Sequence, residues 1–91
     1  MYSRITAVKN PTGLHARPAA EVVATAKKYK SQVKIRIVSD ENKAPVNAKS
    51  IIMLLSLGAC QGSQVEIIAE GEDEKDAVDA VISLIDGGFG E

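Results

Sequence analysis

The sequence predicts an α+β fold in which a four-stranded antiparallel sheet is covered on one face by three helices. Segments with alternating apolar residues are interleaved with segments whose apolar residues recur at helical spacing, in the order β, α, β, β, α, β, α. This order favours an antiparallel sheet with its helices segregated to one face. The 91 residues, of which 45% are hydrophobic, are enough to bury one modest core. We therefore expect a single domain over residues 1–91.

The first half of the chain is expected to form a strand, a helix and a second strand. Residues 2–9 are rich in β-branched side chains and stop at Asn10-Pro11, as a strand ended by a turn does. Their pattern does not show which face of the strand is buried. Residues 33–37 alternate apolar with basic side chains, which predicts a strand with one buried face. Between these strands, a helical stripe is formed by Ala19, Val22, Val23, Ala26 and Tyr29.

A polar connection and a short apolar helix are expected in the middle of the chain. Residues 39–45 are polar and lead to a brief strand over residues 46–48. Ser50 then precedes an apolar run that ends at Gly58, which predicts a short helix capped by the serine hydroxyl. Two helical turns cannot bury every apolar side chain of this run, so part of it should form an exposed patch. We expect that patch to contain Ile51, Ile52 and Leu55.

The last third of the chain predicts a strand followed by a helix. Residues 64–70 alternate apolar and polar side chains and end at Gly71. Asp73 is expected to cap the following helix, whose apolar stripe runs to Gly87-Gly88. The acidic residues at its start suit the helix dipole, and because no histidine accompanies them they do not predict a metal site.

The only histidine, His15, lies where the first strand should give way to the first helix. Gly13 permits a sharp turn before it, and Pro18 marks the first turn of a helix that begins near Ala16. The unpaired N–H groups and partial positive charge of a helix start suit a phosphoryl group on the imidazole. Arg17 adds a fork of donors beside it. From position alone, a surface or capping histidine and a solvated arginine are the alternatives.

Four segments of the chain carry a recognisable pattern. They are GLHARPA at residues 13–19, NAKSII at residues 47–52, SLG at residues 56–58 and AEGEDE at residues 69–74. These segments resemble HPr proteins, the histidine-containing phosphocarriers of the bacterial phosphoenolpyruvate-dependent sugar phosphotransferase system. The resemblance implies an open-faced β-sandwich. It also implies that His15 accepts a phosphoryl group from phosphorylated enzyme I and passes it to EIIA proteins or domains, with Arg17 steadying the group and without a cofactor or metal.

The resemblance further implies surfaces for partner proteins. We expect docking at Thr12, Ala16 and Ala20 together with the apolar patch of Ile51, Ile52 and Leu55. Ser50 matches the serine that an ATP-dependent HPr kinase/phosphorylase phosphorylates in HPr proteins of the Gram-positive type, where the product acts as corepressor with a catabolite-control transcription factor. A helix cap alone also explains a serine at this position. Met53 departs from the glycine that several members have three residues after the serine.

Composition and charge argue against other classes of function. The formal net charge of −1, from 11 basic and 12 acidic residues, provides no electrostatic footprint for nucleic acid or for an anionic membrane. The longest apolar run, residues 51–55, is too short to span a bilayer. Cys60 has no second cysteine with which to form an internal disulfide, and the N-terminus has no signal-peptide pattern. We therefore expect a cytoplasmic protein, with a monomer as the default.

Two other functions compete with a phosphocarrier. A regulator similar to the catabolite-repression HPr-like proteins would act mainly through phosphorylated Ser50, and the presence of His15 argues against it. A small phosphate-handling enzyme such as an acylphosphatase would need an oxyanion loop with its own arginine, and we find no such segment. Sugar uptake and a purely regulatory branch are both compatible with these residues.

Overall fold

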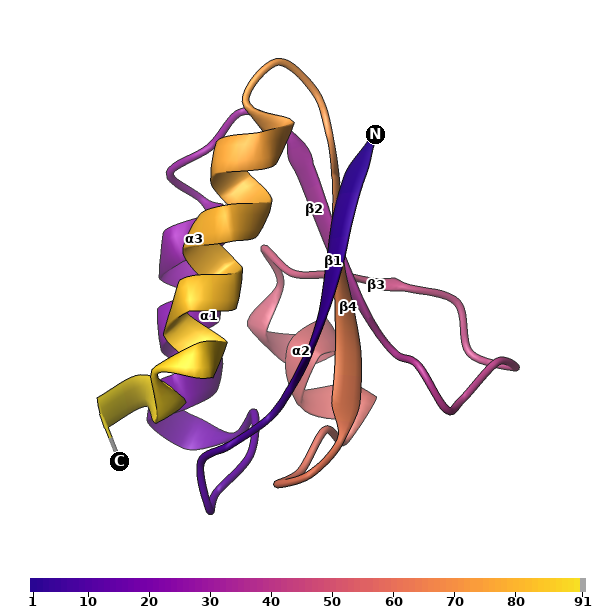
Figure 1. Cartoon of the computed structure of the whole chain (residues 1–91), viewed down its shortest axis with the longest axis vertical. Helices are drawn as coiled ribbons and strands as arrows, with labels where there is room; N and C mark the ends of the chain where they lie inside the picture. Colours follow the sequence, from indigo (N-terminus) through magenta and orange to yellow (C-terminus); the bar gives the residue numbers. More distant parts are fainter. Residues whose placement is uncertain (91) are drawn as a thin grey trace.

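The computed structural model describes residues 1–90 and consists of one sheet with helices packed against it (Figure 1). The order of strands and helices along the chain is the predicted one. After the last α-helix, the chain makes a short 3-10 turn at Gly88–Gly90. The elements are β1 (Tyr2–Ala7), α1 (Ala16–Ala26), β2 (Gln32–Ile37), β3 (Val46–Asn47), α2 (Ile51–Leu57), β4 (Gln64–Glu70) and α3 (Glu74–Asp86).

The sheet has the strand order β1-β4-β2-β3, and each neighbouring pair is antiparallel. Figure 1 shows α1 and α3 side by side on one face of the sheet, and α2 contacts β2 and β3. Strand β4 alternates buried and less buried residues, as a strand with one face on a core must. The fold class predicted from the sequence, an open-faced α+β sandwich, is therefore confirmed.

All three helices and the central strands contribute to a single apolar core. Full burial of an aliphatic side chain stabilises a fold by about 1.5–3 kcal/mol, so this cluster accounts for much of the force that holds helices and sheet together. Its largest fully buried members are Leu14, Ile35, Leu54, Ile67, Ile82 and Ile85.

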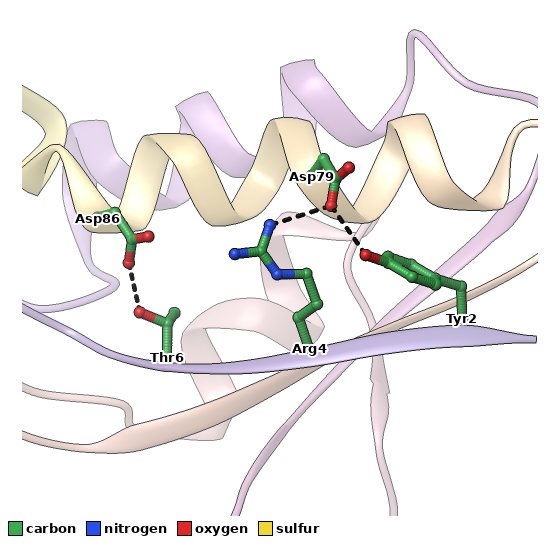
Figure 2. A network of polar contacts seen from close by, with 5 residues as sticks. All are labelled: Tyr2, Arg4, Thr6, Asp79 and Asp86. Atoms are coloured by element: carbon green, nitrogen blue, oxygen red, sulfur yellow. Dashed lines mark hydrogen bonds and ion pairs between the residues drawn. The ribbon is translucent and has the colours of Figure 1, made fainter.

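Strand β1 faces α3 with polar side chains (Figure 2). The Tyr2 hydroxyl and the Arg4 guanidinium both donate to the Asp79 carboxylate, at 3.3 and 3.0 Å. The Thr6 hydroxyl donates to the carboxylate of Asp86, which lies about two turns beyond Asp79 on the same face of α3. Figure 2 shows the three strand side chains pointing toward the helix, so hydrogen bonds and an ion pair fasten this edge strand to α3.

The outward face of β1 carries an apolar side chain instead. Ile5 is 56% exposed, because it alternates with the side chains that point to α3. On this strand the polar side chains face the helix and an apolar side chain faces water. The sequence pattern of residues 2–9 therefore did not reveal the buried face.

The Thr6 hydrogen bond and then the Lys9 ammonium lower the pKa of the Asp86 carboxyl below its usual value.

The prediction that Asp73 caps α3 is wrong. Asp73 precedes the helix, but its side chain makes no capping hydrogen bond. Its carboxylate instead accepts hydrogen bonds from the backbone N–H groups of Lys30 and Ser31, both at 2.9 Å, and from the Ser31 hydroxyl. The turn before α3 is pressed against Ser31, since a Cβ on Gly71 would lie 2.6 Å from the Ser31 hydroxyl oxygen. The Asp73 carboxylate, which the local pattern predicts to cap α3, is thus bonded to the 30–31 loop instead.

Two element boundaries also differ from the prediction. The first helix ends at Ala26, and Tyr29 lies in the turn beyond it, packed partly against the core. The third strand is only two residues long, although Ala48, opposite Val33 in the register, still donates its N–H to the Val33 carbonyl of β2 at 2.9 Å. Within residues 1–90, no helix has the length and apolar character needed to cross a membrane.

Candidate functional site at the start of the first helix

The loop before α1 is closed by contacts that only glycine permits at position 13. Gly13 has a φ of +70°, in the left-handed region that favours glycine. A Cβ there would lie 2.6 Å from the carbonyl oxygen of Ala59 and 2.7 Å from the Cα of Cys60. The next residue, Leu14, is fully buried and donates its N–H to the Ala59 carbonyl at 3.0 Å. This packing fixes the chain immediately before His15.

A buried asparagine supports the same loop. The Asn10 side chain is almost inaccessible to solvent, and its amide nitrogen donates to the Gly13 carbonyl at 2.9 Å and to the Thr12 hydroxyl at 3.0 Å. The sequence pattern identifies Asn10 only as part of a turn. An asparagine before proline signals a turn whether its side chain is buried or exposed, so its supporting role was not predictable from local pattern.

His15 immediately precedes α1, and its side chain is exposed. Its backbone is extended, with φ −127° and ψ 161°, and the imidazole makes no capping hydrogen bond to the helix. Ala16 has a φ of +53°, a left-handed conformation that costs a non-glycine residue about 1–2 kcal/mol. The histidine lies at a helix start, as predicted. The left-handed alanine was missed, because alanine ordinarily signals a right-handed helix.

Arg17 extends from the first turn of α1, and its guanidinium donates to acceptors in Glu21 and Phe89. One guanidinium nitrogen donates to the Glu21 carboxylate at 3.1 Å, an exposed pair four residues apart of the kind that contributes about 0.3–0.5 kcal/mol. Another donates to the backbone carbonyl of Phe89 at 3.0 Å. The sequence predicts Arg17 beside His15 but gives no sign of its contact with Phe89, which lies 72 residues further along the chain.

Ser50 caps α2 as the sequence predicted. Its hydroxyl oxygen accepts the N–H of Met53 at 3.3 Å, and its backbone is extended, with φ −114° and ψ 116°. The helix ends at Gly58, which has a φ of +74° in the left-handed conformation that commonly terminates helices. Both ends of this short helix are therefore set by residues visible in the sequence.

The exposed side of α2 is apolar. We define the α2 apolar surface as Ile51, Ile52, Met53 and Leu55, which are 39%, 76%, 43% and 42% exposed. The predicted exposure of Ile51, Ile52 and Leu55 is confirmed, and Met53 joins them. Only Leu54 and Leu57 of this helix are buried. Exposed apolar clusters of this kind are common in protein–protein contact surfaces.

The remaining predicted docking residues are also accessible. Thr12, Ala16 and Ala20 are exposed, and α1, which carries two of them, contacts α2. A pocket of about 330 Å³ lies elsewhere, between β2 and β3, and His15 does not line it. Over residues 1–90, no three side chains of the His, Cys, Asp and Glu types gather as a metal site would require. The site is thus an exposed helix start beside an apolar surface.

Comparison with known proteins defines the class to which this arrangement belongs. A family model described as "PTS HPr component phosphorylation site" matches residues 2–86. The phosphocarrier protein NPr of Proteus mirabilis is 40% identical over 90 residues, which cover 99% of this chain and 96% of that protein. The crystal structure of HPr-C-His from Thermoanaerobacter tengcongensis shares 46% identity at a TM-score of 0.90, covering 100% of this chain and 98% of that one.

The chain therefore belongs to the HPr family of phosphocarriers of the phosphotransferase system. It also resembles part of a much longer protein. The multiphosphoryl transfer protein of Haemophilus influenzae is 38% identical over 84 residues, which cover 92% of this chain but 17% of that protein. Related sequences thus occur both as a small protein and as one segment of a protein named for multiple phosphoryl transfers.

Proposed function

We propose that His15 accepts a phosphoryl group from phosphorylated enzyme I and passes it to EIIA proteins or domains. The observation that carries this proposal is the exposed imidazole at the start of α1, within the segment matched by a phosphorylation-site family model. A ring nitrogen of the neutral imidazole is the nucleophile, and the product is a phosphoramidate. The protein is itself the intermediate, so it needs no substrate pocket around the histidine.

The start of α1 supports the phosphorylated state electrostatically. The His15 imidazole makes no capping hydrogen bond to this helix, and the N-terminal end of a helix carries partial positive charge. Backbone N–H groups there are natural donors to a dianionic phosphoryl group. We assign Arg17 the role of a further donor, since a guanidinium forms strong charge-assisted hydrogen bonds with phosphate oxygens.

We assign the docking of enzyme I and EIIA to one shared surface made of the α2 apolar surface with Thr12, Ala16 and Ala20. All of these side chains are exposed. Thr12 lies in the loop before α1, and the others lie on α1 and α2, two helices that contact each other. A carrier that meets two partners in turn needs a surface that binds each of them briefly. Four exposed apolar side chains on a two-turn helix provide such a surface without any charge that one partner would reject.

We further propose that Ser50 is a regulatory site, phosphorylated by an HPr kinase/phosphorylase and then read by a catabolite-control transcription factor. Ser50 is partly exposed and directly adjoins the α2 apolar surface. A phosphate there would remain compatible with the helix start and would place a charge at the edge of the docking surface. The cytoplasmic location and the monomeric state stay predictions of the sequence.

The direct test is incubation with enzyme I, phosphoenolpyruvate and Mg²⁺, followed by mass mapping of the modified residue. We expect one phosphoryl group on His15, stable in base and labile in acid, and its transfer onward when EIIA is added. A phosphoryl group on another residue, or none, would refute the carrier proposal. A separate incubation with HPr kinase/phosphorylase and ATP tests Ser50, and modification elsewhere would leave that residue as a helix cap only.

A further inference from the structure

We propose that the C-terminal turn Gly88–Gly90 is a positioning element, in which the backbone carbonyl of Phe89 orders the Arg17 guanidinium beside the start of α1. The inference rests on the role proposed above for Arg17 and names a residue that supports it. The family model ends at residue 86, so this turn lies outside the segment by which the family is recognised.

The Glu21 and Phe89 acceptors differ in how rigidly they can hold the Arg17 guanidinium. The Glu21 carboxylate is at the end of a flexible side chain on the surface of α1, with 36% of that side chain exposed. Because the Glu21 side chain can move together with the guanidinium, it does not fix the position of Arg17. The Phe89 acceptor is a backbone carbonyl, which can move only if the chain around it moves. We therefore take the carbonyl as the fixed point of this contact.

The Phe89 carbonyl is held in place by its own side chain. The ring is 6% exposed and belongs to the apolar core, although the residue lies at the end of the chain. Its backbone is left-handed, with a φ of +55°, and lies between Gly88 and Gly90 at +65° and +75°. Three successive left-handed residues are tolerated because two of them are glycine. The turn thus buries the ring while presenting the carbonyl to Arg17.

This arrangement matters for transfer because arginine is a costly side chain to immobilise. A free arginine populates many rotamers, and most of its conformational freedom is lost when it binds a phosphoryl group. If the guanidinium is already ordered, that loss occurs on folding rather than during the reaction. Phe89 never touches the phosphoryl group in this proposal. It acts only through Arg17, so its effect must disappear when Arg17 is absent.

The first measurement is the mobility of Arg17 itself. We propose to record ¹⁵N relaxation of the Arg17 Nε–H group in the full chain and in three variants, Phe89→Ala, Phe89→Leu and Gly88→Ala. Gly88→Ala adds a methyl group that meets nothing within 4 Å, so it disturbs the turn through the strain of an alanine at a φ of +65° and not through a clash. We expect an ordered group in the wild type and in Phe89→Leu, and a mobile one in the other two.

The second measurement is the rate of phosphoryl transfer from phosphorylated enzyme I, in a cycle with Arg17→Ala. We expect Phe89→Ala and Gly88→Ala to slow transfer about five- to tenfold and Phe89→Leu to restore it. In the Arg17→Ala background the same changes should alter the rate less than about twofold. Gly62→Ala, at another left-handed glycine with open space around it, controls for unspecific backbone strain.

The outcomes separate this inference from the proposed function. An unchanged Arg17 mobility in Gly88→Ala, or equal slowing in both arginine backgrounds, would overturn the positioning role while leaving His15 as the phosphoryl acceptor. An Arg17→Ala variant that transfers as fast as wild type would overturn it as well. Failure of the wild-type chain to accept a phosphoryl group on His15 would instead overturn the proposed function, and the relaxation data would still decide whether Phe89 orders Arg17.

Discussion

The starts of α1 and α2 have similar backbones but differ in what the preceding side chain does. His15 and Ser50 are both extended N-cap residues, with φ values of −127° and −114°. At α2 the serine hydroxyl binds an N–H group of its own helix, that of Met53. At α1 the imidazole makes no such bond and lies exposed. A short side chain closes a helix start, whereas a ring that cannot reach back leaves it available to a ligand.

The residues that follow sharpen the difference. After His15 the chain passes through a left-handed Ala16 to a charged Arg17, whose contacts come from its own helix and from the C-terminal turn. After Ser50 the chain continues with three exposed apolar residues. One helix start is therefore equipped to hold a charged group, and the other borders a surface suited to a protein partner. The two proposed events, transfer and docking, take place on neighbouring helices.

Removing each N-cap side chain is the largest expected contrast. His15→Ala should abolish phosphorylation by enzyme I, because the nucleophile is gone, with little loss of stability since the ring is exposed. Ser50→Ala should keep the transfer rate and lose about 1 kcal/mol of unfolding free energy with its cap. Phosphorylation assays and chemical denaturation of both variants test this. Residual modification of His15→Ala would place the acceptor elsewhere.

Adding a charge at the second helix start should separate stability from transfer. Ser50→Asp keeps a carboxylate oxygen where the hydroxyl capped α2, so the melting temperature should hold or rise slightly. The same charge borders the α2 apolar surface, where it must be desolvated on docking, and the rate of transfer from enzyme I should fall about tenfold or more. Calorimetry and the enzyme I assay give the pair of values. Transfer at the wild-type rate would mean that Ser50 does not border the docking surface.

Truncating an exposed apolar side chain should have a smaller effect on docking. Ile52 is 76% exposed, so Ile52→Ala should change the unfolding free energy by less than about 0.5 kcal/mol. Its loss from the α2 apolar surface should weaken enzyme I binding by about 1 kcal/mol, or about fivefold. Ile5→Ala is the matched control, because Ile5 is 56% exposed on β1. Equal effects on binding from both variants would argue against a docking site on α2.

The smallest expected effect is at the start of α3, where removing the Asp73 charge should change how the melting temperature depends on pH in acid. Hydrogen bonds from the Ser31 side chain and from backbone N–H groups, that of Lys30 first, lower the pKa of Asp73 to about 2. A carboxyl whose pKa is lower in the folded state stabilises the fold above its ordinary pKa of 3.8 and loses that contribution as the pH falls toward 2. Asp73→Asn should therefore show a weaker fall in melting temperature than wild type between pH 4 and pH 2.

Ser31→Ala is the control for this third comparison. It removes the hydrogen bond that contributes most to the lowered pKa of Asp73 and should bring the acid dependence partway toward that of Asp73→Asn. If wild type and Asp73→Asn lose stability in parallel on acidification, the Asp73 carboxylate does not hold the 30–31 loop as the hydrogen bonds imply. In that case the acid sensitivity would come from other carboxylates of the chain, such as Asp86.

Local pattern was sufficient where a structural role depends on residues a few positions apart. Alternation and helical spacing predicted the order of the elements, because burial of one face imposes those periods. Gly13 and Pro18 together predicted that His15 would lie at a helix start, and the structure places it there. Ser50 and Gly58 fixed the ends of α2 for the same reason, since cap and stop act within one turn of the residues they satisfy.

The sequence alone thus determined the fold class, the position of the histidine and the cap of the second helix, all of which follow from contacts within about one helical turn or one strand. Only the tertiary structure decided which acceptors Arg17 binds and which groups the Asp73 carboxylate satisfies. Those partners lie 72 and 42 residues away, and no local period records them. These contacts arise because packing brings the C-terminal turn to the start of α1 and the 30–31 loop to the start of α3. The Phe89 carbonyl then accepts from Arg17, and the Ser31 N–H donates to Asp73.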